Sequence, residues 1–188
     1  MSKGTLKRIG MLAAAVVLFA AVHEGMHAVL ALLWSEYGSF AVRPYGFEVI
    51  YQTPVAERAG LKWGFISGAG NATTIFLGYF LYGFRAKLAA LRSPFSRGLS
   101  FYAAIIFLSA DPFNLSIGPF FYGGDIGGLV AGFGLNRFLI QGFFLLILLF
   151  NRELIARRIL PLFGVRTKHP LFRPWFKPDL ISPAAGVR

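Results

Sequence analysis

The chain has 188 residues, of which 56% are hydrophobic and 16% aromatic, and it carries a formal net charge of +11 at pH 7. An apolar content this high, with a mean hydropathy of +0.61, exceeds that of an ordinary soluble domain and predicts an all-α membrane protein. Because cysteine is absent, disulfides and thiolate metal sites are excluded, and any metal ion must bind His, Asp or Glu. The basic residues flank apolar runs, which favours a lipid bilayer over nucleic acid as the partner.

The first predicted span covers residues 9–34 and follows a short basic segment that contains Lys3, Lys7 and Arg8. This order resembles a signal peptide. The apolar run is about 25 residues long, however, and has no small-residue cleavage site, so we expect a retained membrane helix.

A short membrane-associated β-hairpin is predicted at residues 38–52, in the segment "GSFAVRPYGFEVIYQ". Apolar and aromatic residues alternate with other residues on both sides of a Pro-Tyr-Gly turn, as expected for two short strands. The alternative interpretation is a loop with two short extended pieces.

Three further spans are predicted at residues 63–83, 99–118 and 137–151, which gives about four transmembrane helices. The third is interrupted by "SADPFNLSIGP". Polar groups and a broken helix at membrane depth are tolerated only where protein or a water-filled cavity surrounds them, so this interruption indicates a functional site. Beyond Asp125, the small-residue stretch "IGGLVAGFGLN" predicts a short, closely packed helix.

The distribution of Lys and Arg predicts the orientation of the chain. Fifteen of these residues fall on one side of the four predicted spans and four on the other, which places both termini in the cytoplasm. We therefore expect an integral protein of a bacterial inner membrane. Residues 1–151 form its membrane-embedded core, and residues 152–188 form a basic, aromatic tail on the cytoplasmic surface.

The segment "HEGMH" at residues 23–27 carries the chemistry of the first span. His23 and His27 are four residues apart and therefore lie on one helix face, where both imidazoles can bind one Zn²⁺. Glu24 is placed to accept a proton from water bound to such an ion, whose pKa zinc lowers toward ~7. The alternative interpretation is a structural cluster in which His and Glu side chains bond one another.

A catalytic zinc ion usually has three protein ligands. His169 lies in the predicted cytoplasmic tail, on the wrong side of the membrane, so the third ligand should be a carboxylate near the interrupted span. The candidates are Asp111 and Asp125. Asp125 is flanked by glycines that permit close backbone approach, although it could be only a helix N-cap, whereas Asp111 before Pro112 is typical of a turn or a helix end.

Together with two later motifs, this segment resembles the site-2 protease family of intramembrane zinc metalloproteases. The motifs are "HEGMH" at 23–27, "SGAGN" at 67–71 and "NLSIGPFFYGGD" at 114–125, and the resemblance covers roughly residues 10–150. It implies that His23, His27 and Asp125 bind zinc, that Glu24 is the catalytic base, and that Asn71 and Asn114 are catalytic residues that bind the substrate backbone or steady the transition state. Family members also carry membrane-associated strands that can pair with an extended substrate.

The expected function is thus that of a zinc-dependent endopeptidase that cleaves a transmembrane substrate. The alternative is a non-catalytic or metal-binding, protease-like subunit that stabilises a larger membrane complex through partner subunits. A transporter or channel is disfavoured, because the ionisable residues gather on one helix turn and one loop rather than along a path across the bundle.

Overall fold

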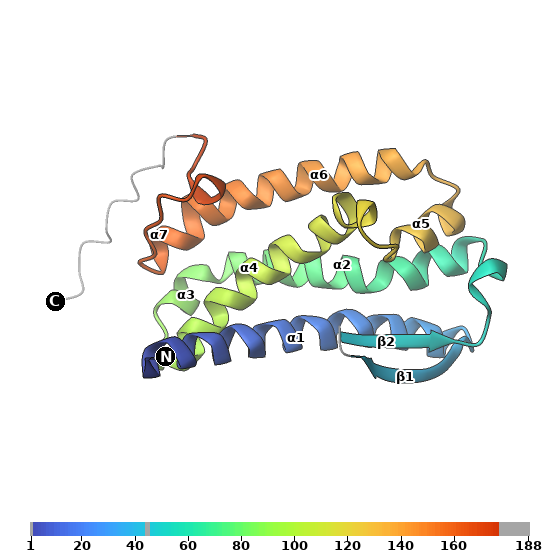
Figure 1. Cartoon of the computed structure of the whole chain (residues 1–188), viewed down its shortest axis with the longest axis horizontal. Coiled ribbons are helices and arrows are strands. Elements are labelled where there is room, and N and C mark those ends of the chain that lie inside the picture. The colour runs from blue at the N-terminus through green and yellow to red at the C-terminus, as the bar shows by residue number, and fades with distance from the viewer. Residues whose placement is uncertain (1, 44–45, 177–188) are drawn as a thin grey trace.

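The computed structural model describes residues 2–43 and 46–176 and is mostly helical (72%), with one two-stranded antiparallel sheet. Its helices and strands are α1 (Lys3–Leu33), β1 (Tyr37–Arg43), β2 (Gly46–Tyr51), α2 (Leu61–Gly83), α3 (Arg85–Ala89), α4 (Pro94–Ser116), α5 (Ile126–Phe133), α6 (Arg137–Leu154) and α7 (Leu160–Leu162). The long helices α1, α2, α4 and α6 lie along the long axis of the molecule. The N-terminus, α3 and α7 lie at one end, and α5 lies toward the other (Figure 1).

Three helical segments are long and apolar enough to cross a membrane: Lys3–Leu33, Pro94–Ser116 and Arg137–Leu162, the last of which continues from α6 through a π-helical turn into α7. They include the predicted span at 137–151, all but the last residue of the one at 9–34, and most of the one at 99–118. Helix α1 has 31 residues, a length of about 46 Å that exceeds the ~30 Å hydrocarbon core of a bilayer.

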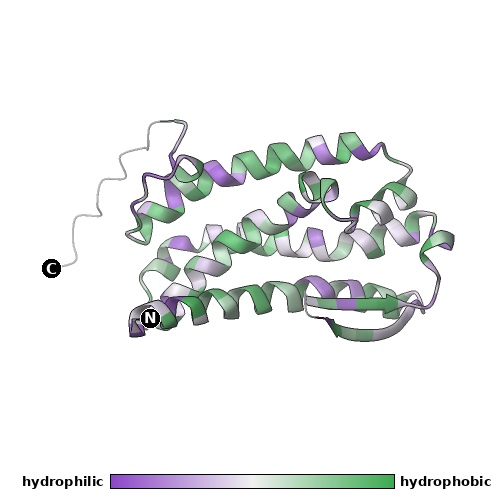
Figure 2. Cartoon of the chain, in the orientation of Figure 1, coloured by the Kyte–Doolittle hydropathy of each residue, from purple (hydrophilic) through white to green (hydrophobic). Residues whose placement is uncertain are grey.

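The predicted span at 63–83 corresponds to helix α2, which is not among these three segments. Figure 2 shows why: α1 is hydrophobic over most of its length, whereas α2 contains many residues of intermediate or polar character. Helix α2 packs against α1, α4 and α5, and its buried residues include Gly64, Asn71 and Thr74. Because protein covers one face of α2, that face does not need to be apolar, whereas Phe65, Phe76 and Phe80 lie on the exposed face. The count of four spans stays a prediction.

The predicted hairpin is confirmed. Strands β1 and β2 are antiparallel, with Phe40 opposite Val49 and Val42 opposite Phe47. Its predicted turn includes residues 44 and 45, which lie outside the described residues. Both strands contact α1, β2 more extensively than β1, so the hairpin lies beside the second half of that helix (Figure 1).

Helix α4 passes through Pro112 and ends at Ser116. Proline has no N–H to bond the carbonyl of Leu108, one turn earlier. Asn151 of α6 donates from Nδ2 to this carbonyl at 2.6 Å, and the Tyr79 hydroxyl donates to Asn151 Oδ1 at 2.7 Å. We refer to Tyr79, Leu108 and Asn151 as the Asn151 clasp. It fastens α6 to α4 and α2 with a side chain that is completely buried.

Helix α6 continues beyond residue 151, where the cytoplasmic tail is predicted to begin. Ile155, Ile159 and Leu160 are buried against Ala104 and Leu108 of α4, so the first part of the predicted tail packs on the bundle. Arg152 then donates to the carbonyls of the following segment, at 2.6 Å to Leu171 and 3.0 Å to Pro170. Residues 177–188 of the tail lie outside the described residues.

Candidate metal centre

His23 and His27 lie on one buried face of α1, as their spacing predicts. Their Nε2 atoms are 3.1 Å apart, and the two residues are only 7% and 2% exposed. Glycine at position 70 permits the close approach of α2 to this face. A Cβ atom there would lie 2.7 Å from the His23 carbonyl oxygen and 2.7 Å from His27 Nε2, so a larger residue would fill the space between the helices.

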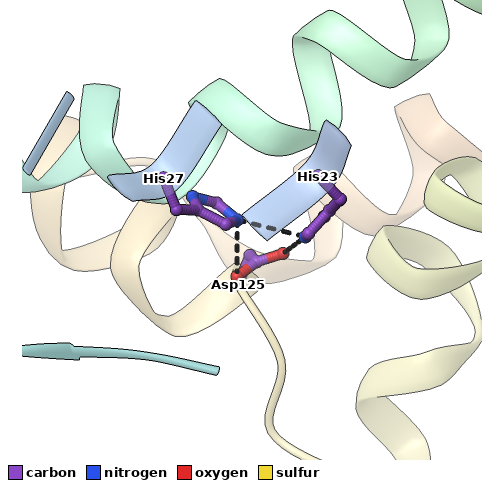
Figure 3. A group of neighbouring side chains, drawn as sticks. All are labelled: His23, His27 and Asp125. Carbon is purple, nitrogen blue, oxygen red and sulfur yellow. Dashed lines mark hydrogen bonds and ion pairs between the residues drawn. The ribbon is translucent and has the colours of Figure 1, made fainter. Parts of the chain in front are cut away.

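Asp125 completes a group of three possible ligands (Figure 3). Its Oδ2 lies 3.2 Å from His23 Nε2 and its Oδ1 lies 3.6 Å from His27 Nε2. Four ligands at ~2.0–2.1 Å in a tetrahedron around zinc lie about 3.3 Å from one another. The three atoms are therefore spaced like one face of a zinc coordination tetrahedron. Of the two carboxylate candidates, Asp125 is the one that points toward both imidazoles.

The backbone explains how Asp125 reaches the histidines. Gly124 has a φ of 63°, a left-handed conformation that glycine adopts readily, and α5 begins directly after Asp125. Asp125 occupies the N-cap position of α5, but its side chain makes no capping hydrogen bond. Its carboxylate is directed to the histidines instead, so its role is not that of a simple N-cap.

The Nδ1 atoms of both imidazoles are held by other helices. His27 Nδ1 lies 2.6 Å from the carbonyl oxygen of Ile66, which only accepts hydrogen bonds, so this nitrogen carries the proton. His23 Nδ1 lies 3.1 Å from Asp111 Oδ2. When each Nδ1–H donates to its oxygen, each Nε2 has a lone pair directed at the centre, which is the arrangement of metal-binding histidines.

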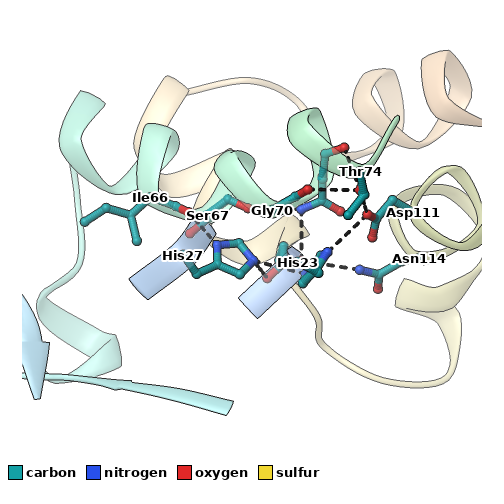
Figure 4. A network of polar contacts seen from close by, with 10 residues as sticks. His23, His27, Ile66, Ser67, Gly70, Thr74, Asp111 and Asn114 are labelled. Carbon is teal, nitrogen blue, oxygen red and sulfur yellow. Dashed lines mark hydrogen bonds and ion pairs between the residues drawn. The ribbon is translucent and has the colours of Figure 1, made fainter. Parts of the chain in front are cut away.

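Asp111 lies inside α4, not at a turn or helix end, so that interpretation of the sequence is wrong. It is 1% exposed and accepts hydrogen bonds from His23 and from the Thr74 hydroxyl (Figure 4). The helix continues past the Asp-Pro pair because the Asn151 clasp bonds the carbonyl that Pro112 leaves free. Asp111 therefore positions the imidazole of His23.

The two asparagines that were predicted to be catalytic both contact Asp125. Asn71 Nδ2 donates to Asp125 Oδ2 at 2.9 Å and to the Ser67 carbonyl at 3.1 Å, which uses both of its N–H groups. Asn114 Nδ2 donates to the same carboxylate oxygen at 3.3 Å. In this structure both side chains position Asp125, and Asn114 retains one further N–H.

Glu24 is half-buried and lies on the wall of a cavity of about 760 Å³. His23, Asp111 and Asn114 line the same cavity, which extends between α1, α4 and α6 and is otherwise largely apolar. The backbone of Val49 in β2 also lies near the Glu24 carboxylate. Glu24 is thus next to the ligand group and accessible to a molecule in the cavity.

Charge and burial act together on the groups near the centre. Burial by itself would raise the pKa of Asp125. When the Nε2 atoms of His23 and His27 carry protons in place of a metal ion, their hydrogen bonds to Asp125 outweigh burial and hold that pKa well below its usual range. The carboxyl is therefore ionised and can act as a ligand. Burial, with the negative charges of Asp125 and Glu24, raises the pKa of Tyr51, and burial raises that of Tyr122 near the same site.

Sequence reasoning did not identify the supporting roles of Asp111, Thr74 and Gly70. The available signals were an acidic residue inside an apolar helical run and a glycine spaced one helix turn from Thr74. The third histidine, His169, lies outside the group, as predicted, and caps the turn Pro170–Phe172. Comparisons with protein-family models, with curated proteins and with solved structures found no match to this chain.

Proposed function

We propose that the chain is an intramembrane zinc-dependent endopeptidase similar to the site-2 proteases. The observation that carries this proposal is the convergence of two histidine Nε2 atoms and the Asp125 carboxylate beside Glu24. With both Nδ1 protons donated outward, two lone pairs face each other across 3.1 Å, an arrangement that a cation between them stabilises.

His23, His27 and Asp125 would hold the zinc ion. Nitrogen and carboxylate ligands suit zinc, and the three atoms leave one side of the tetrahedron open. When bound there, a zinc ion acidifies a coordinated water and polarises a carbonyl oxygen. Asp125 is 23% exposed at its side chain, in contrast to the histidines, so the open side faces the accessible part of the site.

The residues of the chain supply the remaining functions. Glu24 would accept and return the proton during peptide hydrolysis, since its carboxylate lines the same cavity as the ligands. The second N–H of Asn114 is a candidate donor to the oxyanion that develops on the scissile carbonyl. Gly46 and Phe47 of β2 also line the cavity, so an unwound substrate segment could pair with this strand.

The membrane setting forms part of this proposal. We infer that α2 crosses the bilayer with α1, α4 and α6, which makes four spans, in a bacterial inner membrane. The ends of the long helices alternate along the molecule, so the basic residues at the starts of α1 and α4 and at the end of α6 gather at one end (Figure 1). The positive-inside rule assigns this end, with both termini, to the cytoplasm.

The proposal is tested with the purified chain in lipid nanodiscs, by zinc analysis and by cleavage of a panel of single-span transmembrane substrates. We expect about one zinc ion per chain in the wild type and in Glu24→Gln, and loss of cleavage only in the latter. Glu57→Gln, an exposed acid in the turn before α2, is the matched control and should cleave normally.

Equal behaviour of wild type and Glu24→Gln in every cleavage assay, with zinc present, would overturn the peptidase assignment. It would leave the non-catalytic, metal-binding subunit of a larger membrane complex as the function of this chain.

A further inference from the structure

Three arginines surround a second cavity, at the end of the bundle opposite the hairpin. Arg8 of α1, Arg97 of α4 and Arg92, just before α4, line a cavity of about 550 Å³. The remaining lining residues are mostly apolar: Met11, Leu91, Pro94, Gly98, Phe101, Tyr102, Phe163, Gly164 and Val165. This cavity shares no residue with the metal centre.

The three guanidinium groups have no counter-charge within the described residues. None of them forms an ion pair there, and all three residues are exposed. The first turn of α4, between Arg92 and Arg97, contains no acidic residue. The Ser93 hydroxyl caps the Ser96 N–H, but no carboxylate compensates the positive end of this 23-residue helix dipole. The cavity therefore carries positive charge that no nearby acid in the described residues balances, and it should attract an anion.

Polarity changes with depth in this cavity. Arg8 lies near the start of α1, and Met11 lies about one turn farther into the bundle. Arg97 lies near the start of α4, and Phe101 lies one turn farther in the same direction. The two helices thus present a positive rim followed by an apolar floor, which is the order of phosphate and acyl chain in a phospholipid.

Gly98 brings the two helices together at this point. A Cβ atom on residue 98 would meet the side chain of Met11, so glycine permits the close contact of α1 and α4 below the arginine rim. The rim is therefore held by two packed helices and is a shaped site rather than a diffuse basic surface.

We propose that this cavity binds the headgroup of an anionic phospholipid, with its phosphate on Arg8, Arg92 and Arg97 and the first part of an acyl chain on the apolar floor. A free phosphate ion would satisfy the arginines but leave the floor exposed, which favours the lipid. The inference depends on the membrane placement of the chain and not on its catalytic activity.

The test is lipid binding by the purified, full-length chain in detergent micelles, measured by native mass spectrometry at constant ionic strength. Phosphatidylglycerol should bind the wild type, and phosphatidylcholine should bind much more weakly. The double variant Arg92→Gln/Arg97→Gln should bind phosphatidylglycerol roughly 10- to 30-fold more weakly. Millimolar inorganic phosphate should not displace the lipid.

The matched control is Lys3→Gln/Lys7→Gln, which removes the same charge from the same end of the bundle, at the start of α1, but outside the cavity. It should change the affinity less than twofold. Equal losses in the two double variants would show only diffuse attraction, displacement by phosphate would show a soluble-anion site, and equal binding of the two lipids would show only apolar contact. Each of these results would overturn the proposal. Arg8→Gln provides a second test from α1 if the first variant does not fold, and the helical circular dichroism signal, which should stay unchanged, reports the folding of all variants.

Discussion

The candidate metal centre and the Asn151 clasp both bury polar side chains between long helices, but the hydrogen-bonding needs of these side chains are met differently. In the clasp, the Asn151 amide donates to one oxygen and accepts from another, and no charged group takes part. In the candidate metal centre, two imidazole nitrogens and a carboxylate converge on one point, and the buried Asn71 Oδ1 has no hydrogen-bond partner in the described part of the chain.

This difference distinguishes buried polar groups that stabilise the fold from buried polar groups that bind a ligand. A buried group that is fully paired stabilises the fold, whereas acceptors that converge need a ligand to balance them. The clasp should therefore govern stability without affecting metal binding, and the ligand group should govern metal binding. The following variants test that separation.

The largest expected effect is that of His27→Ala. Removing one of three protein ligands should weaken zinc binding on the order of a thousandfold, so the bound zinc falls from about one ion per chain to nearly none. Elemental analysis of the purified protein measures this directly. His169→Ala, which removes the histidine outside the group, should retain zinc, and equal zinc contents in the two variants would contradict the assigned site.

Asn151→Leu should have the next largest effect, and on stability alone. It leaves the buried Leu108 carbonyl without its donor and the Tyr79 hydroxyl, on a partly exposed residue, without its acceptor. We expect a cost of about 1–3 kcal/mol in the free energy of unfolding, mostly from the carbonyl. Reversible denaturation in detergent checks this value. Tyr79→Phe should cost less, because the bond from Asn151 to Leu108 survives. A loss of zinc affinity in folded Asn151→Leu would contradict the expectation that the Asn151 clasp affects stability but not metal binding.

Asp111→Asn tests the side chain that links α4 to the ligand group. An amide oxygen can still accept from His23 Nδ1–H but lacks the charge that increases the basicity of the imidazole. We expect zinc affinity to fall about 10- to 100-fold, measured by competition with a chelator. Thr74→Val, which removes only the hydroxyl bonded to Asp111, should have a smaller effect. An unchanged zinc affinity in Asp111→Asn would show that Asp111 stabilises the fold and does not support metal binding.

The smallest effect is expected at Glu36, outside both clusters. Contacts with Lys62 and Thr53 hold the pKa of this carboxyl below its usual range. Its contribution to stability is therefore complete above the ordinary carboxyl pKa of 4.5 and is lost as the pH falls through the lowered value. Glu36→Gln should lower the unfolding temperature by roughly 1–2 °C at neutral pH.

The difference in unfolding temperature between the wild type and Glu36→Gln, measured at several pH values, tests this pH dependence. The wild type and Glu36→Gln should converge as the sample is acidified, since protonated Glu36 no longer attracts Lys62. A difference that stays constant down to acidic pH would show that the ion pair contributes nothing.

The sequence by itself determined the local features of this protein. Its composition predicts the helical class, the alternation at 38–52 predicts the hairpin, and the four-residue spacing of His23 and His27 places both imidazoles on one face of α1. Each of these depends on residues that are close along the chain, whose relative positions follow from backbone geometry alone.

Only the tertiary structure decided which distant groups meet these residues. Asp111 was misread because an Asp-Pro pair is typical of a turn, and Asn151, 40 positions away along the chain, is what lets α4 continue through it. The choice of Asp125 over Asp111 beside the two Nε2 atoms also depends on how α4 and α5 pack against α1. Such contacts join residues whose separation in the sequence carries no periodic signal, so they are set by the packing of the whole bundle.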